Sequence, residues 1–481
     1  MQKALCAFGA LIAVLAPPPA LAADSRAAGT AKDLAEIRDE IKQLKDSYES
    51  RIQALEARLK EAESKARAAE IKAATAVAAQ SAQTASAAPA SPAPVLPAPT
   101  SGRGGGIAAF NPAVSLVLQG RYTNLSQDPN RFAISGFIPG GDVGPGKRGF
   151  SLDESELNLD ANVDQHFFGH ATLAFLPDSR ISAEEVYFLT TSLPTGLTLK
   201  AGRFFSGIGY QNDQHQHVWD FIDAPLAYQA FLGGQFGNDG AQLKWLAPTD
   251  IFLELGVEAG NGENFPGSAR NRNGVNASAL ALRVGDDIGV SHSWLVGLSA
   301  LRTHAENRNF TQTDSFGNDA ANSFTGRSNV AIADFVYKYA PNGNPIYTNF
   351  KLQGEYFHRR ETGDLTFDAN GALGLTNSDA YRSTQSGWYM QGVYQFAPYW
   401  RVGLRYDRLD AGTLDLASNA ANLGGTGFNP DKTSVMVDWS PSEFSRFRLQ
   451  AAREHRGPGV TDNQLFLQYI LTIGAHGAHK F

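Results

Sequence analysis

Cysteine is almost absent from this chain. Cys6 is the single cysteine among 481 residues, and it lies in an apolar stretch over residues 4–16 that follows Lys3. Three prolines and Ala20-Leu21-Ala22 come next, a pattern that predicts a secretory signal peptide over residues 1–22. The mature chain would then contain no cysteine, which excludes disulfides, thiolate metal sites and cysteine nucleophiles.

Long hydrophobic runs are also missing. After the predicted signal no apolar run reaches the ~18 residues that a spanning helix needs. The net charge of −7 and the hydrophobic content of 43% leave the protein class open, but 48 Gly, 29 Phe and 15 Tyr favour strands. Since only helices and closed barrels satisfy their backbone in lipid, a membrane location would require a β-barrel.

Residues 31–72 carry apolar side chains at alternating spacings of three and four, which is a coiled-coil pattern. A solitary amphipathic helix would show a similar pattern, but the segment has little to pack on except copies of itself. We therefore expect a periplasmic coiled coil that makes the protein a homo-oligomer. As a helix it would reach about 63 Å at ~1.5 Å per residue, which also suggests an envelope tether in contact with peptidoglycan. Residues 73–109, rich in Ala, Pro and Gly, are predicted to be a linker.

From residue 113 onward the apolar residues recur at every second position. Glu156, Asn158 and Asp160 alternate with Leu157 and Leu159, for example. The pattern predicts about sixteen strands, near 113–124, 151–163, 166–177, 182–192, 196–205, 239–247, 250–260, 275–286, 292–303, 328–340, 345–359, 384–397, 399–410, 431–440, 443–455 and 462–474.

Short turns and long polar loops separate these predicted strands. The long loops fall near 125–150, 206–238, 261–274, 304–327, 361–383 and 411–430. Outer-membrane barrels have short periplasmic turns and long outside loops, and an even strand number returns the C-terminus to the periplasm. The sequence therefore predicts an all-β transmembrane barrel of about 16 antiparallel strands over residues 110–481, surrounded by outer-membrane lipid.

Several stretches resemble known outer-membrane families. With its N-terminal coiled coil, the chain resembles phosphate-selective porins. Phe110-Asn111-Pro112-Ala113, Leu199 to Phe205, Trp219-Asp220-Phe221 and Gly474 to Phe481 are more similar to a proteobacterial group often labelled zinc-regulated or TonB-dependent outer-membrane receptors. The resemblance implies assembly by the barrel-assembly machinery, with Phe481 as the terminal aromatic residue. TonB-dependent receptors use about 22 strands and a plug domain, which this chain has no room for, so we expect a family likeness without that mechanism.

The loop over residues 206–238 is the strongest functional candidate. It would be the third outside loop, which in general porins folds inward and narrows the channel. Carboxylates and aromatic edges in such a loop set charge and size selectivity, although an ordinary solvated loop would also be polar. The candidate constriction residues are Tyr210, Asp213, His215, His217, Trp219, Asp220 and Asp223.

Two histidine pairs are candidates for zinc or copper binding. His215 and His217 lie in the same loop, and His476 and His479 lie near the C-terminus. Each pair offers two ligands where a tetrahedral site needs three or four, and hydrogen-bonded pore or tail histidines would look the same. No other cofactor is expected.

Charged residues on the polar strand faces are candidate lumen residues. Arginine rings would favour anions, but both signs occur, and many of these charges would merely brace the wall. The candidates are Lys200, Glu254, Glu258, Arg283, Arg401, Arg405, Arg446 and Arg448.

No nucleotide-binding, hydrolase or metalloprotease motif is present in the sequence. We therefore expect no enzymatic activity and no nucleic-acid partner. The sequence favours a porin-like channel for small hydrophilic solutes or ions, which the resemblance to porins suggests is trimeric. A receptor for a metal or small nutrient, or an envelope-tethering barrel, are the alternatives.

Overall fold

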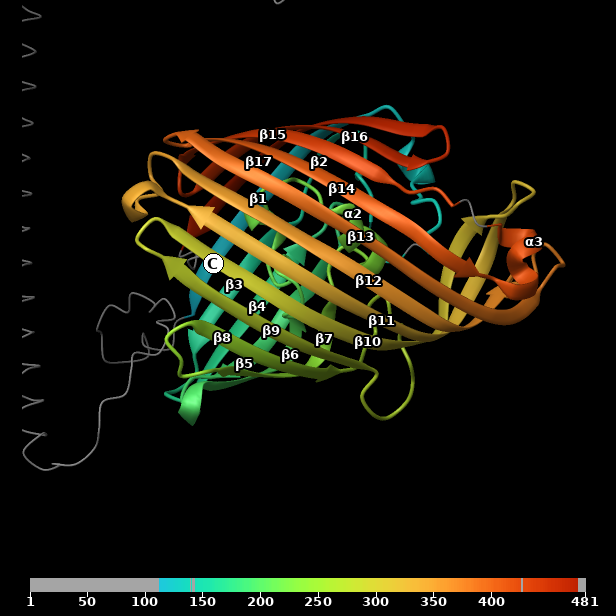
Figure 1. Ribbon diagram of the computed structural model, residues 1–481, viewed down its shortest axis with the longest axis horizontal. Helices are drawn as coiled ribbons and strands as arrows, with labels where there is room; N and C mark the ends of the chain where they lie inside the picture. The colour runs from blue at the N-terminus through green and yellow to red at the C-terminus, as the bar shows by residue number, and fades with distance from the viewer. Residues whose placement is uncertain (1–111, 139, 141–142, 425–426, 475–481) are drawn as a thin grey trace, which may run out of the picture. The chain divides into compact units, whose positions relative to one another are not determined.

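The barrel closes on itself in the computed structural model, which describes residues 112–138, 140, 143–424 and 427–474. β1 (Ala113–Leu125) pairs antiparallel with β17 (Val460–Gly474), from Ser115 opposite Gly474 to Leu125 opposite Gln464 (Figure 1). β2 (Gly149–Leu152) and β3 (Ser155–Asn162) both pair with β1 and share one place in the wall. The described strands therefore form a closed antiparallel barrel of sixteen strands, as predicted.

Every other strand pairs with its neighbours in sequence. The remaining strands are β4 (Phe167–Phe175), β5 (Ile181–Thr190), β6 (Leu197–Phe205), β7 (Gly237–Leu246), β8 (Phe252–Gly260), β9 (Ala277–Ile288), β10 (His292–Thr313), β11 (Asp319–Tyr339), β12 (Asn349–Phe367), β13 (Asn377–Ala397), β14 (Trp400–Asp415), β15 (Asp431–Ser442) and β16 (Ser445–Gly457). Two short α-helices, α2 (Leu226–Leu232) and α3 (Ala420–Leu423), lie in the loops.

The strands lie where the sequence predicts them, but several of them extend into segments that were predicted to be loops. β10 and β11 continue through most of the predicted loop 304–327 and are joined by a turn at Asp314–Asn318. β12, β13 and β14 likewise extend into the predicted loops 361–383 and 411–430. Where a strand extends past the lipid, its outward side chains face water and can be polar. Thr362 and Asp364 on β12 are examples. The two-residue hydrophobic pattern therefore fades there while the backbone pairing continues.

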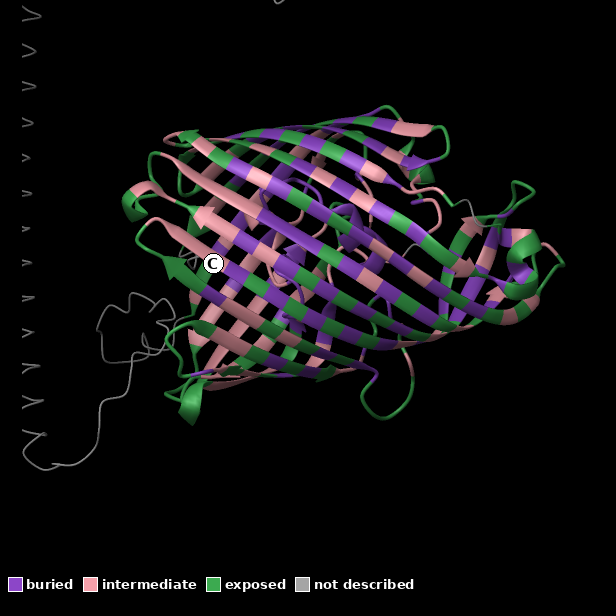
Figure 2. Cartoon of the chain, in the orientation of Figure 1, coloured by how far each residue is buried: buried purple, intermediate pink, exposed green. Residues whose placement is uncertain are grey.

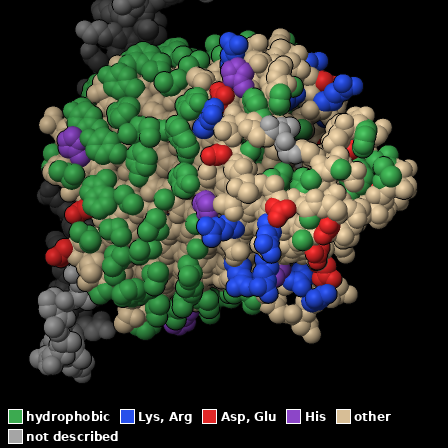
Figure 3. Space-filling model, turned by 45° about the vertical axis from the view of Figure 1, so that its right-hand side comes forward, with side chains coloured by type: hydrophobic (Ala, Val, Ile, Leu, Met, Phe, Trp, Pro, Cys, Tyr) green, Lys and Arg blue, Asp and Glu red, His purple; other side chains and the backbone are tan. Residues whose placement is uncertain are grey.

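The wall has an apolar outer face and a polar inner face. Along β12 the exposed Tyr356 alternates with the buried Glu355 and Phe357, and the same alternation of exposed and buried residues is visible on the neighbouring strands (Figure 2). Exposed leucine, valine and aromatic side chains gather in a broad belt around the outside (Figure 3). A closed sheet with an apolar belt and no open edge is how strands cross lipid. The protein is therefore an outer-membrane-type β-barrel.

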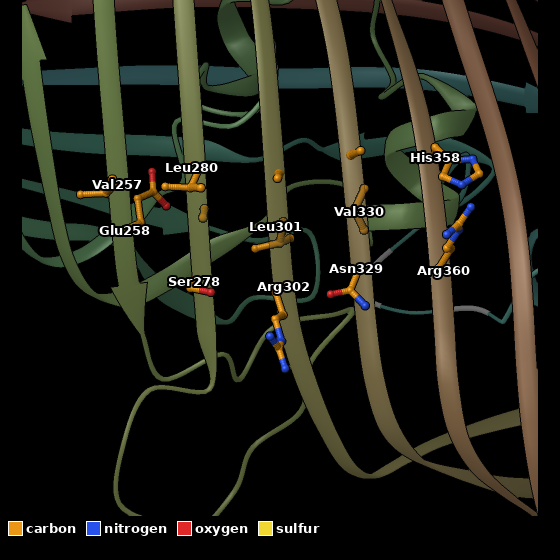
Figure 4. Close-up of a pocket in the computed structure, with 13 residues that line it drawn as sticks. Val257, Glu258, Ser278, Leu280, Leu301, Arg302, Asn329, Val330, His358 and Arg360 are labelled. Atoms are coloured by element: carbon orange, nitrogen blue, oxygen red, sulfur yellow. The ribbon is translucent and has the colours of Figure 1, made fainter.

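The belt ends at a line of polar side chains. Arg302 on β10, Asn329 on β11 and Arg360 on β12 lie opposite one another in the strand register and point outward. With Val257 and Leu280 they border a shallow groove of about 520 Å³ on the outer wall (Figure 4). The three polar side chains mark the boundary between the apolar belt and the extended hairpins.

Some predictions lie outside the described residues. These are the signal peptide, the coiled coil over 31–72, the linker over 73–109, His476, His479 and Phe481. Among the described residues, no helix is long and apolar enough to cross a membrane.

Candidate functional site

The loop between β6 and β7, residues 206–236, lies inside the barrel. It contains α2, whose seven residues are all buried, and α2 is seen within the ring of strands in Figure 1. α2 starts after Pro225 and ends at Gly233, whose φ of 67° is a left-handed conformation that suits glycine at a helix end. The position of this loop inside the barrel agrees with the prediction that it folds inward.

α2 packs in an apolar cluster on one side of the lumen. Phe231 of α2 stacks on Phe357 of β12 with ring centroids 6.1 Å apart, and Tyr228 meets the same ring edge-on at 5.0 Å. From the loop between β1 and β2, Phe137 approaches Phe231 at 5.7 Å. Two loops and the wall from β9 to β14 therefore share one hydrophobic core on that side of the lumen.

Asp220 holds the loop to the far wall. Its carboxylate accepts hydrogen bonds from Lys351 Nζ at 3.0 Å, Arg401 Nη1 at 3.1 Å and Gln391 Nε2 at 3.2 Å. Burial raises the pKa of Asp220, but Lys351 and Arg401 outweigh it and hold that pKa well below the usual range. Asp220 is thus an ionised anchor that joins the loop to β12, β13 and β14.

Asp223 makes a second anchor three residues later. It accepts hydrogen bonds from Lys432 Nζ at 2.7 Å, Arg405 Nη2 at 3.0 Å and Gln450 Nε2 at 2.7 Å. Burial raises the pKa of Asp223, but the nearby charges of Arg405 and Lys432 outweigh this effect and hold that pKa well below its usual range. The loop is therefore also attached to β14, β15 and β16.

Glu355 on β12 is a third anchor, which sequence reasoning missed. It accepts hydrogen bonds from the backbone N–H groups of Tyr210 and Gln211, both at 3.1 Å. The hydroxyls of Tyr228 and Tyr389 donate to it at 2.9 and 2.6 Å. One carboxylate thus fixes both the start of the loop and α2.

The predicted lumen charges mostly hold this loop in place. Arg448 donates to the Trp219 carbonyl at 2.7 Å and Arg446 to the His217 carbonyl at 3.3 Å. Arg283 donates to the Gly207 and Gly209 carbonyls at 3.1 and 2.7 Å. Arg401 and Arg405 also donate hydrogen bonds to the loop. These arginines therefore bind the loop and do not form a ring of side chains around an open pore.

The other three predicted lumen charges lie on the wall from β6 to β8. Glu258 accepts hydrogen bonds from the Gly207 N–H at 2.7 Å and from Gln242 at 2.6 Å. Glu254 pairs with Lys244 at 3.2 Å. Lys200 lies over the Tyr187 ring, 4.3 Å from its centroid. Glu258 thus supports the loop directly, while Glu254 and Lys200 brace the wall.

The loop histidines face glutamates on the opposite wall from the arginines. His215 Nε2 lies 3.0 Å from Glu185 Oε2, and its Nδ1 lies 3.3 Å from Glu156 and 3.5 Å from Glu184. His217 Nδ1 lies 2.9 Å from the other Glu156 oxygen. The two imidazoles stack with centroids 5.8 Å apart. Both are partnered with carboxylates of the wall.

The remaining predicted constriction residues support the loop. Tyr210 packs with Leu295 and Val336, and Asp213 lies 3.8 Å from Arg283. Trp219 is buried, and its indole N–H donates to the Gln214 carbonyl at 2.8 Å. The structure thus collects all seven predicted loop residues inside the barrel.

A cavity of about 700 Å³ remains between the loop and the wall from β1 to β8, toward the long-loop end. Seven acidic and four basic residues line it. They are Asp153, Glu154, Asp178, Glu184, Asp223, Asp239 and Glu263, with Arg121, Lys147, Arg180 and Arg203. Asp178 and Asp239 pair with Arg180 and Arg203, and Arg121 lies 3.7 Å from Asp153. Asp223 is held by Lys432 and Arg405, so three carboxylates, those of Glu154, Glu184 and Glu263, remain against one lysine, Lys147.

Several of the residues that hold the loop carried a signal in the sequence. Lys351, Glu355 and Lys432 occupy inward positions of strands whose alternation is plain, so they could have been placed on the lumen side. The alternation does not show which of them meets the loop, because that depends on contacts across the barrel.

Three solved outer-membrane proteins are similar to this chain at low identity. The loop L8 deletion mutant of OmpT, an outer membrane protein of Vibrio cholerae, is 11% identical, covers 76% of this chain and 100% of its own, and has a TM-score of 0.47. The outer membrane channel DcaP of Acinetobacter baumannii is 12% identical with coverages of 76% and 99% and a TM-score of 0.46. An anion-selective porin from Comamonas acidovorans is 9% identical with coverages of 76% and 99% and a TM-score of 0.42.

The sequence comparison gives a firmer relationship. No family model matches the chain. A protein of Aquifex aeolicus (strain VF5), described as an uncharacterized protein, is 31% identical over an alignment of 401 residues that covers 78% of this chain and 80% of that protein. This chain belongs to the same family as the Aquifex aeolicus protein.

Proposed function

We propose that this protein is a constricted channel of the bacterial outer membrane that passes small hydrophilic solutes or ions. The observation that carries the proposal is the loop over 206–236, which three carboxylates (Asp220, Asp223 and Glu355) hold across the lumen. A loop fixed in this way narrows a barrel without closing it by a separate domain.

The solute path in this proposal runs along the wall from β1 to β8. The apolar cluster around α2 lies on the opposite side, while the 700 Å³ cavity lies on this one. Because the carboxylates of Glu184 and Glu263 outnumber Lys147 in this cavity, the channel would prefer cations.

Planar-bilayer recording of the purified full chain tests this function. We expect stepwise conductance, with a reversal potential in a KCl gradient that shows cation preference. Glu263→Gln should reduce that preference, whereas Glu443→Gln, in the exposed turn between β15 and β16, should not. The absence of any conductance step over a range of salts would overturn the channel proposal.

The resemblance to phosphate-selective porins remains a prediction, and so does the resemblance to the group labelled TonB-dependent receptors, for which the TonB mechanism itself is not expected. The homo-oligomer and the periplasmic tether also remain predictions, and both rest on the heptad-like pattern over 31–72. Chemical cross-linking of the full chain and of a variant lacking residues 31–72 tests both. We expect the deletion to lower the oligomeric order or the attachment to peptidoglycan while leaving single-barrel conductance unchanged.

A further inference from the structure

We propose that His170, Glu185 and His215 form a binding site for one divalent transition-metal cation of the zinc type. His170 lies on β4, Glu185 on β5, and His215 in the loop inside the lumen. Their donor atoms all lie within 4.8 Å of one another. This set differs from the pairs of histidines that the sequence suggested, and it does not depend on the channel function.

The distances fit the geometry of such a cation. With ligand bonds of about 2.1 Å, tetrahedral coordination places two donor atoms roughly 3.4 Å apart. Glu185 Oε2 lies 3.0 Å from His215 Nε2 and 3.8 Å from His170 Nε2. These two separations bracket the expected value, and the third pair of donor atoms lies within 4.8 Å.

The ring nitrogens that face away from the site also have suitable partners. His170 Nδ1 lies 2.7 Å from Asp160 Oδ1, and His215 Nδ1 lies 3.3 Å from Glu156. Metal-binding histidines usually donate their second N–H to a carboxylate, which fixes the ring and its tautomer. His170 Nε2 also lies 2.9 Å from Thr172 Oγ1, a contact that bound metal would have to replace.

The charge around the site favours a cation. Glu154 lies close enough to Glu156 and Glu184 to interact electrostatically with both, and all three lie near His215. Lys200 is the basic residue that acts on Glu185. The carboxylates around the site thus outnumber the nearby basic groups, which are Lys200 and the two histidines. A divalent cation bound there would reduce the repulsion between these carboxylates.

The site lies beside the 700 Å³ cavity. Glu184 and Gln216, the residue after His215, line this cavity. So does Phe205 of β6, whose ring centroid lies 5.5 Å from that of His215. The three protein ligands leave a fourth coordination position, which water or a solute in the cavity could occupy. Two ligands belong to the wall and one to the loop, so bound metal would also tie the loop to β4 and β5.

Metal binding to the purified full chain in detergent tests the proposal. The experiment is done in a His476→Ala/His479→Ala background, which removes the terminal histidines as competing ligands. We expect one equivalent of Zn²⁺ to bind by calorimetry, and Co²⁺ to give the visible absorption of a four-coordinate site. Asp160→Asn should weaken binding roughly 10–100-fold through the histidine it orients.

Ligand variants supply the controls. His170→Ala, Glu185→Gln and His215→Ala should each abolish the Co²⁺ absorption, while His455→Ala, a partly buried histidine paired with Asp431 on another part of the wall, should leave it unchanged. Heat-modifiable electrophoretic mobility verifies that each barrel is folded. No Zn²⁺ binding to the starting protein, or binding that survives all three ligand substitutions, would overturn the site.

If a ligand variant fails to fold, the starting protein still decides the matter. Crystals soaked in ZnCl₂ and measured at the zinc absorption edge should show an anomalous peak between His170, Glu185 and His215. A peak elsewhere, or none, would contradict the proposal.

Discussion

The Tyr228 hydroxyl lies 2.9 Å from both carboxylate oxygens of Glu355. Tyr228 belongs to α2 in the inward loop, and Glu355 to β12 in the wall, and both side chains are buried. The contact joins two segments 127 residues apart in sequence. It shows that the loop is part of the folded core of the barrel and not a flap resting on its surface.

Removing the Glu355 carboxylate should loosen the loop. In Glu355→Leu the N–H groups of Tyr210 and Gln211 and two tyrosine hydroxyls lose their acceptor, and a buried donor left unsatisfied costs about 1–3 kcal/mol. We expect faster hydrogen exchange over residues 209–232 and larger, noisier conductance steps. As a control, Glu306→Leu removes a carboxylate paired with Arg270 and Arg272, outside this loop, and should leave exchange in the loop unchanged. Equal exchange in both variants would mean that Glu355 does not anchor the loop.

Asp223→Asn should destabilise the protein strongly. It leaves Lys432 and Arg405 buried beside a neutral amide, and breaking a buried ion pair costs about 3–5 kcal/mol. The free energy of unfolding in urea, measured in lipid vesicles, checks this. Asp178→Asn, which removes an exposed ion pair with Arg180, should change it little. Adding Lys432→Met to Asp223→Asn should recover part of the loss, and failure to recover any would count against the pair as its source.

The loop should remain anchored in mild acid. The pKa values of Asp220 and Asp223 are held well below the ordinary value of about 3.9. The groups facing them are Lys351 from β12, Arg401, Arg405 and Asp407 from β14, Lys432 from β15, and Arg448 from β16.

Because the folded-state pKa is lowered, the stabilisation is complete above the unfolded value and is lost as the pH falls through the folded value. Protection of residues 220–226 from hydrogen exchange should therefore persist from pH 7 to about pH 4 and be lost only in stronger acid. A transition centred at pH 5 or above would contradict this assignment.

A charge in the apolar belt should destabilise insertion. Leu282 on β9 points outward into lipid, with an exposed fraction of 37%, and Leu282→Arg should cost about 2–4 kcal/mol if it lies near the bilayer centre. Thr325→Arg, outward on β11 opposite Asp364 and beyond the belt, should be nearly neutral. Folding titrations into vesicles measure both. Equal costs for the two substitutions would show that the belt is placed wrongly.

The sequence by itself determined the wall. Alternation such as that over 156–163 is local, because successive side chains of a strand point to opposite faces, so strand positions, inner and outer faces and the strand number could all be predicted. The inward loop was also predicted, from its position after the fifth strand and its composition. The lengths of β10 to β14 were underestimated, since beyond the lipid the outward residues lose their apolar character.

Only the tertiary structure decided which side chains meet. Asp220 pairs with Lys351 and Arg401, and His215 lies next to Glu185. These contacts form because the closed barrel surrounds the loop with strands that are far apart in the sequence. Alternation shows that a side chain faces the lumen but not what lies opposite it. The arginines that suggested a selectivity ring are therefore loop anchors, and the histidines that suggested a pair face glutamates and His170 on the wall.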